Sequence, residues 1–402
     1  MKLRLPLFPS GLGAPRPRYV RLFNRWLRPG LSRIFGWYRR TVLRSTRAVA
    51  VVGSFGKTTA TRTTRVALGL PSPHSGRNTW QSVAKGLLAT RPGQKWVVLE
   101  VGVDGPGQMR PRARMVGPDI AVVMAIGRDH IRSFTSLDVT RHEKAEMVRA
   151  LPASGLAVLN GDDPNVRWMA GETRARVATF GLGEANDVRA ADISIELIEG
   201  APGTQFTLHT AAGTRVVRTK LLGLPPVYAL LASVTVGLQE GVPLDDILNR
   251  LANLAPIDAR LQPVALPGGG IVLRDDVKSG EETIDAALDV LAAIPARRRM
   301  VVFGGIEEPG PSQRIRYRRL GSRMGATAAR VILIDFGASM RSMRAGLRDG
   351  GLSADAIHIV GDASQATAWL SDLGEGDVVL LKGKHNQRLQ RAVQPLLKRD
   401  SK

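Results

Sequence analysis

The sequence Ala48-Val-Ala-Val-Val-Gly-Ser-Phe-Gly-Lys-Thr-Thr59 joins an apolar segment to a glycine-punctuated loop that ends in a lysine and two hydroxyls. The β-branched residues before Gly53 are typical of a buried parallel strand, and residues 58–70 have the pattern of a helix. The loop amides would then lie at a helix N-terminus, where they and the helix dipole attract an anion. We interpret the stretch as a phosphate-binding loop. A plain glycine turn between strand and helix is the alternative.

The loop departs from the usual G-x-x-x-x-G-K-[ST] pattern because Val51 replaces the outer glycine. In the shorter form that remains, Lys57 would neutralise the β- and γ-phosphates of a nucleotide. The Thr58 hydroxyl would supply one oxygen to Mg²⁺, which prefers hard oxygen ligands. The residues predicted to bind the cofactor here are Gly53, Ser54, Gly56, Lys57, Thr58 and Thr59.

The composition limits the classes of protein and of site. A chain of 402 residues suits two or three domains, each with its own core. Because the chain contains no cysteine, disulfides, thiolate zinc sites and cysteine nucleophiles are excluded. It has no run of eighteen apolar residues and no signal-peptide pattern, so we expect a cytoplasmic protein.

The chain is strongly basic, with 57 Lys and Arg against 35 Asp and Glu and a formal net charge of +22. Such a charge attracts polyanions of several kinds, including nucleic acid, anionic lipid and phosphorylated substrates. Residues 1–48 account for about half of the excess, because they contain twelve Lys or Arg and no acidic residue. Nucleic-acid binding is not favoured, since no aromatic and basic recognition platform accompanies the arginines.

The N-terminal region, residues 1–47, divides into a leader and an amphipathic segment. Prolines and glycines predict an unstructured leader over residues 1–18. Apolar residues then recur with a helical period up to Val42, interrupted at Pro29-Gly30, with arginines on the other face. Basic helices with aromatic residues bind anionic membrane surfaces, so residues 19–45 predict peripheral attachment at the inner face of a membrane. An ordinary helix packed against the nucleotide-binding domain is the alternative.

Two further polar residues follow predicted strands of the same sheet. Residues 96–100 form a strand that ends in Glu100, and residues 119–126 form another that runs into Gly127-Arg-Asp-His130. Ligands of doubly wound sheets bind beyond the carboxyl ends of the strands. We therefore expect Glu100, His130 and the phosphate loop to form one metal and nucleotide site. Taken alone, Glu100 could be a solvated edge residue and His130 a turn residue.

The rest of the chain indicates two α/β domains. A helix over residues 139–151 carries Lys144, period-two segments between 193 and 222 predict β-hairpins, and helices follow up to residue 254. After Ala255-Pro256 a second alternation of strands and helices begins, without a phosphate loop. The predicted fold is α/β. A central doubly wound parallel sheet with the phosphate loop and edge hairpins occupies residues 48–255, and a Rossmann-like domain occupies residues 256–402.

Taken together, these motifs resemble those of the Mur ligase family of ATP-dependent, ADP-forming amide ligases, and most closely those of the branch that adds D-alanyl-D-alanine to a UDP-muramoyl peptide. The short form of the phosphate loop is the one that this family uses. The other matching landmarks are Glu100-Val-Gly102, Pro118-Asp-Ile-Ala121, Gly127-Arg-Asp-His130, Phe134-Thr-Ser136, Glu143-Lys-Ala-Glu146, Leu159-Asn-Gly-Asp-Asp163, Arg260-Leu261, Asp275-Asp-Val-Lys278 and Leu381-Lys-Gly383.

The resemblance implies ATP and two Mg²⁺ ions as cofactors. Lys57 and Thr58 would hold the γ-phosphate and the first ion, which Glu100 would share. Lys144 falls where the family has a carbamylated lysine, which would hold the second ion together with His130. The alternative for Lys144 is an unmodified lysine in a helical salt bridge with Glu143 or Glu146. By this resemblance Lys57, Lys144 and His130 are the catalytic residues.

From the second domain, the resemblance assigns three more cofactor-binding residues. Arg260 and Asp276 match positions that contact the ribose and phosphates, and Lys278 resembles a phosphate-reaching lysine of some members. The implied mechanism is in-line attack of a substrate carboxylate on the γ-phosphate, which gives an acyl phosphate and ADP. An incoming amine then forms the amide. The partners expected are small acid and amine substrates, and the arginine excess indicates that they are anionic.

Several departures from the family pattern leave the substrate open. Leu224-Pro-Pro-Val-Tyr-Ala229 replaces the segment with the adenine-contacting asparagine, and Gly76-Arg-Asn-Thr-Trp-Gln81 replaces an asparagine-rich substrate loop. Val103-Asp-Gly105 stands where the muramoyl-peptide ligases have an Asn-His pair. We also expect the N-terminal UDP-sugar-binding domain to be missing. A nucleotide-binding but non-catalytic partner in a membrane-associated biosynthetic complex is therefore the alternative function.

Overall fold

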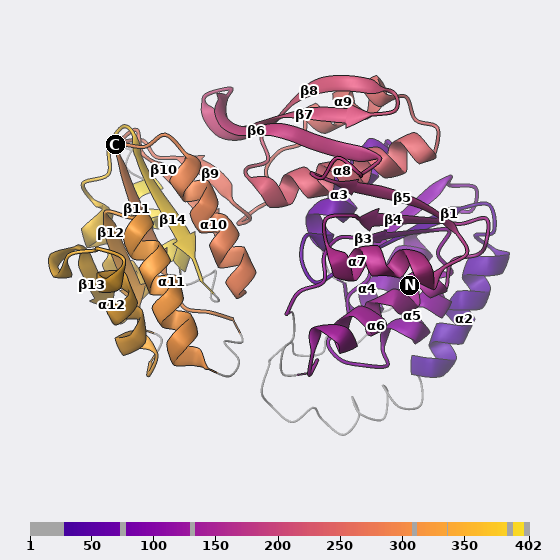
Figure 1. Ribbon diagram of the computed structural model, residues 1–402, viewed down its shortest axis with the longest axis horizontal. Helices are drawn as coiled ribbons and strands as arrows, with labels where there is room; N and C mark the ends of the chain where they lie inside the picture. Colours follow the sequence, from indigo (N-terminus) through magenta and orange to yellow (C-terminus); the bar gives the residue numbers. More distant parts are fainter. Residues whose placement is uncertain are drawn as a thin grey trace, which may run out of the picture.

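The computed structural model describes residues 28–72, 78–128, 133–307, 312–335, 337–383 and 389–397. It contains two sheets, each with helices on both faces (Figure 1). We call the part built on the eight-stranded sheet the central domain and the part built on the six-stranded sheet the C-terminal domain. The predicted leader, the start of the amphipathic segment and His130 lie outside the described residues.

The central sheet has the strand order β2-β1-β3-β4-β5-β6-β7-β8. In this order, neighbouring strands from β2 to β6 pair in parallel, with only two residue pairs between β5 and β6, whereas β7 and β8 extend the sheet as antiparallel hairpins. The bounds of these strands are Arg47–Val52 (β1), Trp96–Glu100 (β2), Ile120–Val123 (β3), Leu156–Asn160 (β4), Arg176–Gly181 (β5), Val188–Ile198 (β6), Ala201–Thr210 (β7) and Gly213–Thr219 (β8).

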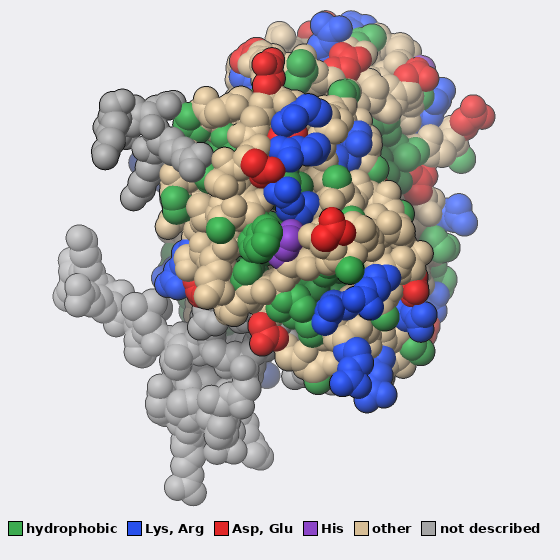
Figure 2. Space-filling model, turned by 90° about the vertical axis from the view of Figure 1, so that its left-hand side faces the viewer, with side chains coloured by type: hydrophobic (Ala, Val, Ile, Leu, Met, Phe, Trp, Pro, Cys, Tyr) green, Lys and Arg blue, Asp and Glu red, His purple; other side chains and the backbone are tan. Residues whose placement is uncertain are grey.

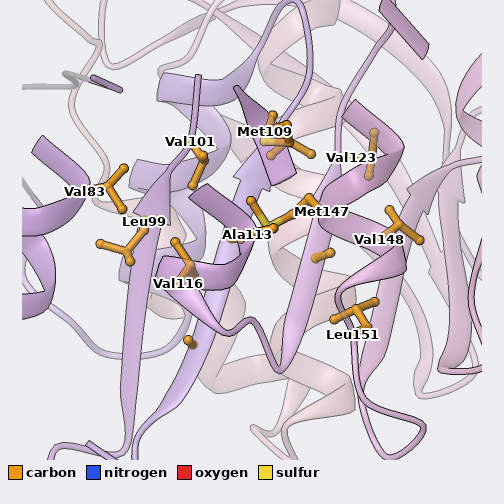
Figure 3. Close-up of a cluster of buried hydrophobic side chains, with 14 of the residues drawn as sticks. Val83, Leu99, Val101, Met109, Ala113, Val116, Val123, Met147, Val148 and Leu151 are labelled. Carbon is orange, nitrogen blue, oxygen red and sulfur yellow. The ribbon is translucent and has the colours of Figure 1, made fainter. Parts of the chain in front are cut away.

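Helices cover both faces of this sheet, each over its own apolar cluster. One face carries α2, α4, α5 and α6, with the short α7 and η2, and the other carries α3, α8 and α9. Figure 3 shows part of the first cluster, in which side chains of α4, α5 and α6 meet those of β2 and β3. The bounds are Arg28–Thr41 (α2), Lys57–Ala67 (α3), Trp80–Ala89 (α4), Met109–Val116 (α5), Leu137–Arg149 (α6), Pro164–Arg167 (α7), Trp168–Glu172 (η2), Leu224–Gln239 (α8) and Leu244–Ala252 (α9).

The C-terminal sheet has the order β13-β12-β11-β14-β10-β9 and is parallel except for β9 at its edge. Helices α10, α11 and α12 cover one face, and η4, η5 and α14 cover the other. The bounds are Gln262–Ala265 (β9), Ile271–Asp275 (β10), Glu281–Ala293 (α10), Arg298–Phe303 (β11), Gln313–Thr327 (α11), Arg330–Ile334 (β12), Met340–Asp349 (α12), Ala354–Ala356 (η3), Ile357–Val360 (β13), Ala363–Leu370 (η4), Asp377–Lys382 (β14), Gln390–Ala392 (η5) and Gln394–Leu397 (α14).

The predicted fold class is confirmed, with local differences. Strand β3 is shorter than the predicted 119–126. It ends at Val123, and the Ala125 carbonyl accepts a hydrogen bond from the Ser54 amide of the phosphate loop. The segment 363–370 is a 3₁₀ helix rather than an α-helix. The last described residues, 389–397, form two short turns rather than one continuous helix. Strand β9 was not predicted, since four residues that include a proline give no clear period of two.

Helix α2 packs against the central domain through one face only. The rings of Phe35 and Trp80 meet edge to face with centroids 5.8 Å apart, and the Trp80 indole N–H donates to the Ser32 hydroxyl at 2.8 Å. On the opposite side Ile34 and Trp37 are each 59% exposed. The face of α2 with Ser32 and Phe35 therefore packs on the central domain, as the alternative expected. The predicted membrane contact remains possible only for the face with Ile34 and Trp37. No helix in the described part of the chain is long and apolar enough to cross a membrane.

Candidate functional site

The phosphate loop connects β1 to α3 with two glycines in the left-handed region. Gly53 has φ +143° and Gly56 has φ +78°, values that side chains rarely adopt. A Cβ on Gly53 would lie 3.1 Å from the Ala125 nitrogen, so the loop passes close to the end of β3. The Ser54 amide donates to the Ala125 carbonyl at 2.6 Å, and α3 begins at Lys57. The amides of the first turn of α3 therefore lie at the carboxyl end of the parallel strands.

Lys57 lies over this loop. Its Nζ donates to the carbonyls of Gly53 and Ser54, both at 2.7 Å, and the residue is only 9% exposed. These contacts hold an ammonium group at the mouth of the loop, next to the amides that would contact a phosphate. Charge-assisted contacts of this kind bind phosphate oxygens strongly.

Glu100 ends β2 directly beside the loop, opposite Val51 in the parallel register. It is 7% exposed, and Asn78 Nδ2 donates to its Oε1 at 3.0 Å. Its Oε2 is buried and has no hydrogen-bond partner among the described residues. A buried carboxylate oxygen is costly without a partner, and a hard cation is a suitable one. The donor set of Glu100 and the Thr58 hydroxyl therefore fits Mg²⁺.

Lys144 of α6 also reaches the loop. It is 2% exposed, and its Nζ lies 3.1 Å from the Ser54 Oγ, which in turn hydrogen-bonds to the Gly127 backbone. Helix α6 thus brings a buried amine within contact of the phosphate loop.

The acidic neighbours of Lys144 have other contacts. Glu143 accepts hydrogen bonds from three successive amides, those of Gly107, Gln108 and Met109, at 2.6 to 2.7 Å. It therefore caps the start of α5. Glu146 accepts from Arg149 at 2.8 Å. Both carboxylates that could pair with Lys144 along the helix therefore have other strong partners. This arrangement does not favour the salt-bridge alternative for Lys144.

His130, the predicted partner of Lys144 at the second ion, lies outside the described residues. Within the described ranges, no three His, Asp or Glu side chains gather in a cluster that could hold a metal ion. The candidate metal site therefore depends on mixed ligands, namely a hydroxyl, a carboxylate and the residues around Lys144.

Of the three residues predicted from the C-terminal domain, Arg260 contacts the loop region directly. Its Nη2 donates to the Thr58 Oγ1 at 3.4 Å. Asp276, at the end of β10, is fully buried, and its nearest cation is Arg274 at 3.7 Å. Lys278 is half exposed, with its Nζ 3.6 Å from Glu307. Asp276 and Lys278 therefore have their ionic partners within their own domain.

Burial changes the acidity of Asp276. It raises the pKa of this carboxyl to about 6, although the positive charge of Arg274 opposes the change. Neither carboxylate oxygen has a hydrogen-bond partner of ordinary geometry among the described residues. A buried carboxylate without donors favours the protonated form, or the approach of a donor such as a ribose hydroxyl.

Sequence reasoning missed a buried ion pair that contacts the backbone next to Arg260. The Lys382 Nζ donates to Asp275 Oδ2 at 2.5 Å, and Asp275 Oδ1 accepts from the Leu261 amide at 3.2 Å. Burial lowers the pKa of Lys382, while the Asp275 charge opposes this effect. Both residues lie in landmarks of the family resemblance, at positions 107 residues apart to which we had given no role.

The altered adenine segment forms a polar network instead. The Tyr228 hydroxyl donates to Asp162 at 2.8 Å, and Asp162 also accepts from the Leu182 amide and Asn186 Nδ2. Burial opposes ionisation of Asp162, but these hydrogen bonds hold its pKa below the usual value. Burial and the bond to Asp162 raise the pKa of Tyr228. The tyrosine that follows the two prolines is thus fixed by the Asn160-Gly-Asp-Asp163 turn.

Two family models match the chain, one over each of its two domains. The Mur ligase middle domain matches residues 45–237, and the Mur ligase, glutamate ligase domain matches residues 259–385. The UDP-N-acetylmuramate–L-alanine ligase of Xanthomonas campestris is 30% identical over 373 residues, which cover 85% of this chain and 72% of that protein. The chain belongs to the Mur ligase family. Its predicted class, an ATP-dependent ligase that forms carbon–nitrogen bonds, is thereby confirmed.

Other relatives and solved structures extend this Mur ligase similarity. The UDP-N-acetylmuramoyl-tripeptide–D-alanyl-D-alanine ligase of Mycobacterium leprae is 27% identical over 370 residues, which cover 84% of this chain and 71% of that protein. MurF ligase from Thermotoga maritima in complex with ADP superimposes with a TM-score of 0.80 at 20% identity, over 93% of this chain and 84% of that one. MurF from Acinetobacter baumannii gives 0.77 at 23% identity, over 92% and 79%.

Proposed function

We propose that this Mur ligase is an ADP-forming amide ligase that activates the carboxylate of a cell-envelope precursor as an acyl phosphate. The observation that carries the proposal is the buried, unpartnered Oε2 of Glu100 beside the phosphate loop. Lys57, Thr58 and the Lys144 amine lie around the same loop, and Arg260 reaches it from the other domain. This arrangement suits transfer of a phosphoryl group between two bound substrates.

The residues fit ATP with magnesium. Thr58 and Glu100 would hold one Mg²⁺, and Lys144, as a carbamate, would hold a second together with His130. When bound, the metal would neutralise charge on the transferring phosphoryl group. Carbamylation would suit this role, because it converts an amine that repels a cation into a pair of oxygen donors. The ribose and phosphates would contact Arg260 and Asp276, with Lys278 near the phosphates.

The protein's own groups act mainly by position and charge. A carboxylate oxygen of the acid substrate attacks the γ-phosphorus in line, and the β–γ bridging oxygen leaves with ADP. The Lys57 ammonium and the loop amides stabilise the charge on the phosphoryl oxygens. The amine then attacks the acyl carbon, phosphate leaves, and the nitrogen loses a proton. No covalent bond to a protein side chain is required.

The relatives support a broad substrate class rather than one particular substrate. The relatives named above act on UDP-linked muramic acid or muramoyl peptides, so we propose a peptidoglycan-type or related envelope acid that carries further negative charge. The three altered segments, around Asn78, Asp104 and Tyr228, are reasons to test more than one acid and amine pair.

The test is release of ADP from ATP and Mg²⁺ with candidate acid and amine pairs. UDP-N-acetylmuramoyl-tripeptide with D-alanyl-D-alanine is the first pair, followed by simpler acyl peptides and amino acids. We expect product only when acid and amine are both present, and none with Lys57→Ala, whereas the matched Lys85→Ala, at an exposed position of α4, retains activity. Tight ATP binding without turnover for any pair would instead favour a non-catalytic nucleotide-binding partner.

We further propose that the protein works at the inner face of a membrane. Helices α2, α4 and α5 contact one another on one face of the central sheet and contain no acidic residue. Ile34, Trp37 and Leu88 are exposed on them, beside Arg33 and Arg40. A surface of cationic and exposed apolar side chains suits an anionic lipid headgroup layer.

A further inference from the structure

A cavity of about 700 Å³ extends from the candidate site along α3 and the edge strand β2. Thr58, Glu100 and Arg260 line its reaction end. The rest of the cavity, which we call its far part, is lined by residues of α3, α4 and β2. The α3 residues that line this far part are Thr61, Arg62 and Arg65.

Arg62 and Arg65 are cations without an acidic partner among the described residues. Their Nε atoms donate to the Ser72 hydroxyl at 2.7 Å and the Pro71 carbonyl at 2.9 Å, contacts that fix the direction of each guanidinium. No carboxylate within the described residues forms an ion pair with either of them. Partial burial lowers the pKa of both groups, with no opposing contribution from a neighbouring anion.

Thr61 gives a second, independent indication of a ligand site. It is 7% exposed and lines the cavity between Thr58 and Arg62. Its hydroxyl oxygen is buried and has no hydrogen-bond partner in the described structure. Buried hydroxyls are nearly always hydrogen-bonded, so this one indicates a polar ligand in the cavity.

Arginines of the C-terminal domain, in contrast, form ion pairs with carboxylates. Arg298 pairs with Asp372 and Asp377, and Arg330 also pairs with Asp372, at 2.6 to 2.9 Å. Basic and acidic side chains lie interspersed on the face of this domain shown in Figure 2. The uncompensated pair on α3 is therefore not explained by a general excess of arginine.

The cavity residues share one stripe of α3. Thr58, Arg62 and Arg65 follow one another at intervals of four and three residues, whereas the opposite face of the helix packs on α8. With a rise of 1.5 Å per residue, Arg62 and Arg65 lie about 6 Å and about 10 Å along the helix from Thr58. The spacing along the helix therefore sets the distance between the reaction end of the cavity and the guanidinium groups of Arg62 and Arg65.

We propose that this cavity binds the acid substrate, and that Arg62, Arg65 and Thr61 hold a second anionic group of that substrate, a carboxylate or a phosphate. The reacting carboxylate lies at the Thr58 end, and the second group lies about 6 to 10 Å away along α3. The inference rests on the proposed ligase function for the identity of the reacting end. Anion binding in the cavity is a separate property, and it can be measured without turnover.

The test uses the full chain with saturating Mg²⁺ and ADP, so that the nucleotide site is filled. Pimelate, heptanoate and inorganic phosphate are titrated by calorimetry at constant ionic strength. Pimelate has two carboxylates and heptanoate has one on a chain with the same number of carbons. Arg62→Gln, Arg65→Gln and Thr61→Val remove the proposed contacts, and Arg62→Lys keeps the charge. Arg215→Gln, an exposed arginine paired with Asp245 elsewhere, is the matched control.

We expect pimelate to bind more tightly than heptanoate, and each glutamine variant to weaken pimelate binding by about tenfold with ADP affinity unchanged. Arg62→Lys retains most of the affinity. Binding of inorganic phosphate that depends on the same arginines identifies the second group as a phosphate rather than a carboxylate. Equal binding of pimelate and heptanoate, or of pimelate to wild type and variants, overturns the proposal. A loss of ADP affinity instead assigns the arginines to the nucleotide and also overturns it.

The two proposals fail in different ways. If no acid and amine pair releases ADP but pimelate binding depends on Arg62, the ligase proposal fails and the anion site stands. If ligation proceeds at the same rate and KM for the acid in the arginine variants, the cavity proposal fails alone.

Discussion

The Arg260 Nη2 lies 3.4 Å from the Thr58 Oγ1, so a side chain from the C-terminal domain contacts the first turn of the helix after the phosphate loop. Thr58 belongs to the central domain, and 202 residues separate the two positions. In our proposal this guanidinium contacts the nucleotide phosphates. The C-terminal domain therefore contributes a side chain to the site that the central domain carries.

Removal of Arg260 will weaken nucleotide binding. We expect Arg260→Ala to lower Mg·ADP affinity by about 10- to 100-fold, because a charged hydrogen bond to phosphate is lost. Arg260→Lys will recover only part of the affinity, since an ammonium lacks the planar fork of donors. Calorimetric titration with ADP measures both effects. Unchanged affinity in Arg260→Ala would show that the contact with Thr58 does not extend to the nucleotide.

The buried pair Asp275–Lys382 will prove more important for stability than for binding chemistry. Lys382→Ala leaves a buried carboxylate without its cation, and we expect a loss of about 3–5 kcal/mol in the free energy of unfolding. The double variant Asp275→Leu/Lys382→Met will lose much less, since no charge is left buried. Urea denaturation measures both values. Equal losses in the single and double variants would contradict this account.

Lys144 can be tested for carbamylation directly. We expect ¹³C-bicarbonate to give a carbamate carbon resonance in the wild-type protein that is absent in Lys144→Ala and retained in Lys95→Ala, a control on the exposed turn before β2. Lys144→Arg will lose ligase activity by at least about 100-fold, because arginine cannot form the oxygen donors that the second ion requires. Full activity in Lys144→Arg would rule out the carbamate.

Residues with local signals could be predicted from the sequence. The loop, Glu100 and Lys144 each follow a strand end or a helical period, and parallel strands bring such ends to one edge of the sheet. Asn78, which orients Glu100, lies between two helices in a segment without a period, and nothing in that segment indicates a contact with a carboxylate. The Asp275–Lys382 pair joins two strands that are adjacent only in the folded sheet.

Helix α2 shows a different limit of prediction from the sequence. Its period predicts two faces, but a period does not state which partner covers each face. The structure assigns one face to Trp80 and the core of the central domain, through Phe35 and Ser32. For Arg62 and Arg65, the same helical period was visible in the sequence. Their lack of acidic partners became apparent only when the surroundings of α3 were known.

Membrane attachment is best tested by point substitution, because deletion of α2 would uncover the apolar surface around Trp80. We expect the full chain to sediment with vesicles that contain phosphatidylglycerol and not with phosphatidylcholine alone. Trp37→Glu and the pair Arg33→Glu/Arg40→Glu will reduce the bound fraction, since each basic residue near such a surface contributes about 1 kcal/mol. Leu197→Glu, on exposed β6, is the control. Equal sedimentation of all variants would show that this face does not bind lipid.

The raised pKa of Asp276 predicts that the stability of the protein depends on pH. Its pKa is about 6 in the folded protein, above the value of 3.8 for an unperturbed aspartate. The folded state therefore binds the proton more tightly than the unfolded state between these values, so stability falls as pH rises from about 4 to about 6. Above that range the loss of stability is complete.

Between pH 5 and pH 7 we expect the wild type to lose about 1 kcal/mol in the free energy of unfolding relative to Asp276→Asn, which cannot ionise. Urea denaturation of both proteins at the two pH values measures the difference. Parallel pH profiles would mean that Asp276 is already ionised at pH 5. In that case a bound cation or donor, rather than burial, controls the carboxylate.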